Sequence, residues 1–94
     1  MSDSERLPSA RMIRAARGLL NLEQAQLGEL VGVDRRTIIR LEADEIQPVN
    51  PRRTRILAAI RDKLEKDHGI RFVYPDKTTG EGVVMKRHAD PMPG

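Results

Sequence analysis

Apolar residues recur at helical spacing along the first two-thirds of the chain. A first helix is predicted over Ser9–Leu20, capped by the serine hydroxyl and interrupted by Asn21. Its expected buried positions are Met12, Ile13, Ala16, Leu19 and Leu20. A last helix is predicted over Pro51–His68, because Asn50 followed by proline is a typical cap and first turn. Its apolar stripe comprises Ile56, Leu57, Ile60 and Leu64.

Two shorter helices joined by a tight turn are predicted within Leu22–Glu42. The first presents one apolar stripe, formed by Leu22, Ala25, Leu27, Leu30 and Val31. Gly32 ends this helix because glycine adopts a left-handed backbone at little cost, and Asp34 then caps the second helix with its carboxylate. Ile38 and Leu41 of the second helix are expected to face inward. Its outer face is left to Arg35, Arg36 and Arg40. This arrangement predicts a helix-turn-helix whose second helix enters a groove lined by phosphate.

Two β-rich runs follow the last helix, one over Ile70–Tyr74 and one over Gly82–Lys86. The connection between them, PDKTTGE, is rich in turn-forming residues, so a hairpin or two short strands are expected. Residues 1–8 and 88–94 lack periodicity and are expected to form a flexible N-terminal tail and a disordered C-terminal tail. The chain is therefore predicted to be mainly α-helical, with a helical domain over residues 9–68 and a β segment over residues 69–87.

The composition narrows the class of protein. The 94 residues suffice for one small domain, with a net charge of +3 and arginine at 13 of the 17 basic positions. Arginine binds phosphate or guanine edges through two parallel hydrogen bonds. There is no cysteine, which excludes disulfides, thiolate metal sites and a cysteine nucleophile. No apolar run reaches the length of a membrane span and the N-terminus lacks signal-peptide character, so the expected location is the cytoplasm, at the nucleoid.

No arrangement of side chains in the sequence predicts catalysis. The two histidines, His68 and His88, lack carboxylates at metal-ligand spacing around them. Ser9 is expected to cap a helix and has no histidine placed to act as its base. We therefore expect no enzyme activity, no metal and no cofactor.

The motif resembles that of the Cro/repressor-type (XRE-like, lambda-repressor-like) helix-turn-helix family from Ile13 to about Leu64. The resemblance rests on Arg17, on Leu22, Gln24 and Leu27, on GVD at Gly32–Asp34 and on TIIRLE at Thr37–Glu42. Three departures are Glu23 in place of a Ser or Thr cap, Gly28 in place of alanine, and Asp44-Glu45 in place of a glycine. The resemblance implies a lambda-repressor-like bundle of about four helices with a short C-terminal β-hairpin or strand pair.

The resemblance also implies roles for individual polar residues. The second motif helix would lie in the major groove of double-stranded DNA and read base edges with Arg35, Arg36 and Arg40, each of which has a solvated surface position as its alternative. Arg17 and Glu42 would form a structural ion pair between the first helix and the end of the reading helix. The expected contacts to the DNA backbone are Gln24, Thr37, Asn50, Arg52 and Arg53, with local capping or packing as the alternative.

The resemblance further implies a homodimer on a palindromic operator, since one copy of the chain contacts only about four or five base pairs. The expected dimer interface lies on the β segment and comprises Ile70, Phe72, Tyr74, Val83 and Met85. Alternatively, these strands cover the core of their own chain. The implied function is a sequence-specific transcriptional regulator, an autorepressor of prokaryotic or phage type. Two alternatives keep the fold: an autoregulating antitoxin with a toxin partner, and a protein-interaction module.

Overall fold

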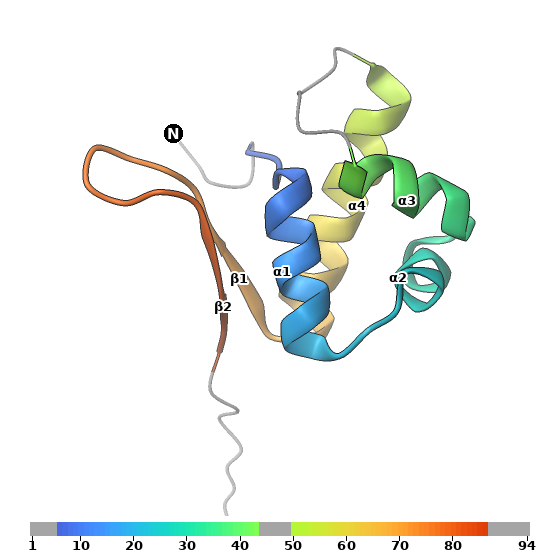
Figure 1. The fold of residues 1–94 in the computed structure, drawn as a ribbon, viewed down its shortest axis with the longest axis horizontal. Helices are drawn as coiled ribbons and strands as arrows, with labels where there is room; N and C mark the ends of the chain where they lie inside the picture. The colour runs from blue at the N-terminus through green and yellow to red at the C-terminus, as the bar shows by residue number, and fades with distance from the viewer. Residues whose placement is uncertain (1–5, 44–49, 87–94) are drawn as a thin grey trace, which may run out of the picture.

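The computed structural model describes residues 6–43 and 50–86. Within these ranges four helices precede a hairpin, in the order α1 (Ala10–Leu20), α2 (Gln24–Val31), α3 (Arg35–Ala43), α4 (Pro51–Asp67), β1 (Ile70–Val73) and β2 (Gly82–Met85). Figure 1 shows the hairpin on one side of α1, with α2 and α3 on the other. This order confirms the predicted helical bundle with a short C-terminal hairpin.

Local sequence signals set the ends of the first two helices. At the start of α1, the Ser9 hydroxyl oxygen accepts a hydrogen bond from the Met12 N–H at 3.2 Å. At its end, Asn21 adopts the left-handed conformation with φ 59°. Gly32 ends α2 in the same conformation, with φ 78°. These ends agree with the sequence predictions.

The turn between α2 and α3 requires a glycine at position 28. A Cβ atom added to Gly28 would lie 2.6 Å from the carbonyl oxygen of Val33, a backbone atom that cannot easily move aside. The Val33 N–H also donates to the Gly28 carbonyl at 2.9 Å, so the turn folds back onto α2. The departure from the alanine of the family pattern therefore has a steric cause in this chain.

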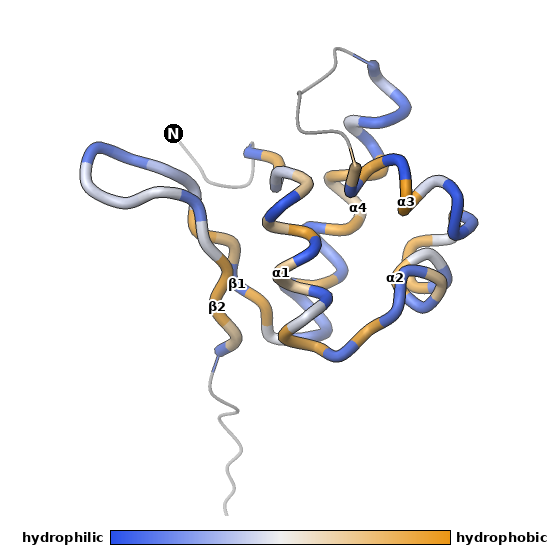
Figure 2. The backbone as a smooth tube through the Cα atoms, in the orientation of Figure 1, coloured by the Kyte–Doolittle hydropathy of each residue, from blue (hydrophilic) through white to orange (hydrophobic). Residues whose placement is uncertain are grey.

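One face of each helix and one face of the hairpin build the core. Its buried members are Met12, Ile13, Ala16, Leu27, Ile38, Leu41, Leu57, Ile60, Leu64, Ile70 and Phe72. Two predicted core positions are wrong, since Leu19 is 47% exposed and Ala25 is also exposed. Periodicity gives the angle of a side chain around its helix, but it does not say whether a neighbouring element covers that turn. In Figure 2 the paired strands are largely orange, whereas their connecting loop is blue to white.

The hairpin packs onto the helices through one face. Its strands are antiparallel, with Ile70 opposite Met85 and Phe72 opposite Val83. Strand β1 lies against α4 and strand β2 lies against α1. Because alternate residues of a strand share a face, Ile70 and Phe72 both enter the core and are 0% and 4% exposed. The β segment thus shares one hydrophobic core with the helices.

The residues just before α1 are tied to α4 and the hairpin. Arg61, only 8% exposed, donates from Nη1 to the carbonyl oxygen of Arg6 at 2.8 Å, and the Tyr74 hydroxyl donates to the same oxygen at 3.3 Å. The Arg6 guanidinium lies 5.6 Å from the centroid of the Tyr74 ring, and Pro8 is buried. Partners distant in sequence therefore contact residues 6–8, which the sequence assigned to a flexible tail. The predictions for residues 1–5, 44–49 and 87–94 lie outside the described residues.

Candidate nucleic-acid interface

The start of α3 is fixed by Asp34. Its Oδ1 accepts hydrogen bonds from the backbone N–H and from the hydroxyl of Thr37, both at 3.0 Å. These two bonds, with smaller contributions from the charges of Arg36 and Arg40, lower the pKa of the Asp34 carboxyl below its ordinary value. The predicted cap is therefore present, and its negative charge also faces the positive end of the helix dipole.

The two faces of α3 differ sharply in chemistry. The inward Ile38 and Leu41 are 0% and 2% exposed. All three arginines that the sequence assigned to the outer face are exposed: Arg35, Arg36 and Arg40. Ile39 lies among them and is 36% exposed. The buried face packs against α1 and α2, so the helix presents its cationic face to solvent.

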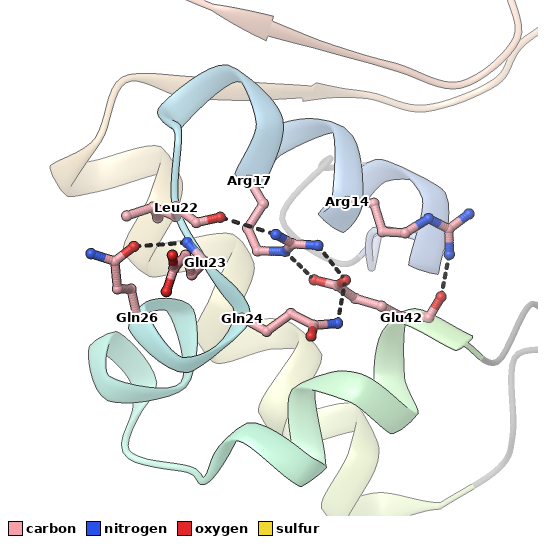
Figure 3. Close-up of polar contacts among 7 residues, drawn as sticks. All are labelled: Arg14, Arg17, Leu22, Glu23, Gln24, Gln26 and Glu42. Atoms are coloured by element: carbon pink, nitrogen blue, oxygen red, sulfur yellow. Dashed lines mark hydrogen bonds and ion pairs between the residues drawn. The ribbon is translucent and has the colours of Figure 1, made fainter.

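A buried carboxylate joins α1, α2 and α3 (Figure 3). Glu42 is 3% exposed and accepts hydrogen bonds from Arg17 Nε at 2.7 Å and Nη2 at 2.8 Å. The ion pair expected from the resemblance is thus present, and this hydrogen bonding raises the pKa of Arg17. Arg17 Nη1 also donates to the Leu22 carbonyl at 3.0 Å, so one guanidinium spans the connection between α1 and α2.

Gln24 and Thr37, both expected to meet phosphates, already make contacts within the chain. Gln24 is the first residue of α2, and its Nε2 donates to Glu42 Oε1 at 3.2 Å. The Thr37 hydroxyl donates to Asp34, as described above. Glu23 precedes α2, and its N–H donates to the Gln26 side chain at 2.8 Å, which satisfies one unpaired donor at the helix start. The structure therefore holds the Gln24 amide at the junction of α2 with the end of α3.

The start of α4 lies beside α3. Asn50 Oδ1 accepts from the N–H groups of Arg52 at 2.9 Å and Arg53 at 3.3 Å, which is the predicted cap. Arg53 Nη2 reaches across and donates to the Leu41 carbonyl at 3.2 Å. An open groove of about 190 Å³ separates α3 from this end of α4. Asn50, Arg52 and Arg53 line it on the α4 side, and Arg40 lines it on the α3 side. The structure thus places Asn50, Arg52 and Arg53, which were predicted to contact the DNA backbone, near α3.

Arg14 of α1 also reaches the end of α3. It is half-buried and donates from Nη1 to the backbone carbonyl of Glu42. Figure 3 shows it beside Arg17 on α1, with both directed at the end of α3. Its three-residue spacing from Arg17 is the sequence signal that places the two on one helix face.

The dimer interface predicted on the β segment needs correction. Ile70 and Phe72 are buried in the core of their own chain, so the prediction that they form a dimer surface is wrong. Tyr74 and Val83 are half-buried against that core, whereas Met85 is 42% exposed. The alternation of a strand predicts which residues share a face, but tertiary packing decides what covers that face.

Two kinds of feature are absent from the described ranges. No cluster of three or more metal-ligating side chains occurs in residues 6–43 and 50–86. Within that same part of the chain, no helix combines the length and the apolar character needed to span a bilayer.

Comparison with known proteins supplies the family. A family model described as helix-turn-helix matches residues 13–60, about half of the chain. No curated protein and no solved structure matches. The matched residues extend from α1 into α4 and include the capped turn, the arginine face of α3 and the ion pair at its end. The chain belongs to the helix-turn-helix family of XRE-type DNA-binding transcription regulators.

Proposed function

We propose that this protein recognises a specific sequence of double-stranded DNA by placing α3 in the major groove, and that it represses transcription by occupying a promoter. The observation that carries the proposal is the division of α3 into two faces. Ile38 and Leu41 are buried, while the three arginines of the opposite face are exposed: Arg35, Arg36 and Arg40. A helix with this division can enter a groove without uncovering the core.

The chemistry of the exposed face favours guanine. An arginine fork matches the N7 and O6 acceptors of guanine, and each good pair is worth roughly 1–3 kcal/mol of discrimination. Ile39 shares the exposed side of α3 and offers an apolar contact for a thymine methyl group. We therefore propose a half-site that contains guanine, read by Arg35, Arg36 and Arg40.

The backbone contacts would flank this helix. Gln24 opens α2, where the helix start favours an anion, and Thr37 lies in the first turn of α3. Asn50, Arg52 and Arg53 lie across the groove at the start of α4. Arg53 also donates from Nη2 to the Leu41 carbonyl at 3.2 Å, which ties this end of α4 to α3. These contacts would fix register, whereas the arginines of α3 would supply sequence preference.

The proposed dimer uses the exposed part of the hairpin. Val84 and Met85 are 41% and 42% exposed, and they adjoin the half-buried Val83. These residues, with Tyr74, replace Ile70 and Phe72 as candidates for the interface. Two copies related by a two-fold axis would read half-sites about one DNA turn apart, which gives a palindromic operator.

A selection from random DNA duplexes tests the proposal. The protein is allowed to enrich a preferred sequence, and binding to that duplex is then measured across a salt series. The Arg35→Ala/Arg36→Ala variant should lose most of the sequence preference, because two reading forks are gone. The control is Lys66→Ala/Arg71→Ala, which removes the same charge from exposed positions on α4 and β1.

The outcomes distinguish sequence-specific binding of DNA from non-specific electrostatic binding. We expect the control to retain its preference and the wild-type footprint to cover two half-sites. Affinity should fall with salt, with a log–log slope of about −0.9 for each phosphate neutralised. If the wild type enriches no sequence even at low salt, the proposal is wrong. Purification of the chain with a protein partner would then favour one of the interaction roles.

A further inference from the structure

The end of α3 carries backbone acceptors that need partners. The last four carbonyls of any helix lack a donor within that helix, and those of Leu41 and Glu42 are among them here. The sequence after Ala43 is Asp44-Glu45, so the glycine that commonly supplies a left-handed cap is missing. Two acidic residues also follow the negative end of the helix dipole, which is the less favourable order of charge.

Two arginines from other helices supply those partners. Arg14 of α1 donates to the Glu42 carbonyl, and Arg53 of α4 donates to the Leu41 carbonyl at 3.2 Å. Arg17 of α1 binds the Glu42 carboxylate at the same place. Cations at this end of a helix also complement its dipole. Side chains of α1 and α4 therefore hold the end of α3.

We propose that Arg14 is a positioning residue for DNA recognition, acting through the Glu42 carbonyl to hold the last turn of α3 in its reading orientation. Arg40 stands in that last turn, two residues before Glu42. Movement of the turn would displace the Arg40 fork from a base edge, where a bidentate pair tolerates little misplacement. The inference rests on the proposed function, since it assigns α3 to the major groove.

The geometry distinguishes this role from a phosphate contact. Arg14 is half-buried and directs a donor at a backbone oxygen of α3 in the same chain. A residue that acts in this way should alter the ratio of specific to non-specific affinity, while leaving the number of neutralised phosphates unchanged. A phosphate contact should instead weaken binding to all sequences and reduce the salt slope by about 0.9.

The test replaces Arg14 with methionine, which keeps an apolar stem and removes the donors. The matched control is Arg11→Met on the same helix, where the side chain is 65% exposed and pairs with Glu81 of the hairpin. Binding is measured by anisotropy on the selected duplex and on a scrambled duplex, across salt. We expect Arg14→Met to lose about tenfold in specific affinity beyond the control, which is ~1.4 kcal/mol and close to the lower end for one charge-assisted hydrogen bond. The salt slope should match the control, and Arg14→Lys should recover part of the loss.

A second measurement needs no DNA. Amide hydrogen exchange in Leu41–Ala43 should be faster in Arg14→Met than in the control, whereas exchange in α1 should be the same in both. Unchanged exchange, an unchanged affinity ratio, or a reduced salt slope would each overturn the inference. Failure of the proposed function is recognised separately, because the wild type itself would then show equal affinity for both duplexes. Circular dichroism identifies an unfolded variant, and Arg14→Lys then carries the test.

Discussion

The ion pair between Arg17 and Glu42 allows a sharp prediction about stability. Glu42→Gln keeps the shape of the side chain but removes the charge that faces the guanidinium. Breaking a buried pair on one side costs about 3–5 kcal/mol, because the remaining charge is left without compensation. Glu42 is 3% exposed but the Arg17 side chain is 22% exposed, so water recovers part of the cost. We therefore expect Glu42→Gln to lower the free energy of unfolding by about 2–4 kcal/mol, a large part of the ~5–15 kcal/mol of a small domain.

The assay is urea unfolding followed by the helical circular dichroism signal. A change in midpoint at constant slope reports stability alone. The matched control is Asp67→Asn, which breaks the exposed pair between Lys63 and Asp67 at 2.9 Å. Such a surface pair four residues apart on one helix is worth about 0.3–0.5 kcal/mol. The two variants should therefore differ several-fold in their effect.

A double variant separates the pair from its surroundings. Arg17→Met/Glu42→Leu replaces both charges with apolar groups of similar size, and it should cost less than the sum of the single changes. If Glu42→Gln instead costs under about 1 kcal/mol, the pair behaves as a surface contact and our account of the end of α3 is refuted.

Two further predictions concern the turn and the cap of the motif. Gly28→Ala should destabilise the fold by about 1–3 kcal/mol by overpacking against the Val33 carbonyl, although alanine favours helix. Gly18→Ala, which meets no atom within 4 Å, should instead gain up to about 1 kcal/mol; equal effects in urea unfolding would contradict the steric argument. Asp34 should titrate below its ordinary pKa of 3.8 in carboxyl NMR. Because its folded pKa is lowered, its contribution is complete above the unfolded pKa and is lost as pH falls through the folded value, so α3 should fray in acid; a pKa at or above 3.8 would refute the cap.

Several parts of the fold follow from local sequence. The helix starts at Ser9 and Asn50 and the stop at Gly32 depend on hydrogen bonds and backbone angles within a few residues. The same is true of Asp34, whose carboxylate accepts a hydrogen bond from the Thr37 N–H three residues away. Such signals can be recognised from the sequence alone, because both partners of each hydrogen bond lie within the same short stretch of chain.

The exposed face of α3 was also predictable. Once Ile38 and Leu41 were assigned to the inside by their spacing, the three arginines of the helix had to lie outside. The ion pair of Arg17 with Glu42 entered through the family resemblance rather than through spacing, because 25 residues separate the two.

Local sequence was enough to predict the helices, their caps, the two β-rich runs and the cationic face of the motif, but it left open whether those runs pair as a hairpin. Only the tertiary structure decided that Ile70 and Phe72 belong to the core of their own chain, and that Arg14 turns toward the end of α3. The physical reason is the same in both cases. Periodicity fixes the direction of a side chain relative to its own helix or strand, whereas burial and hydrogen-bond partners depend on which distant element packs against it.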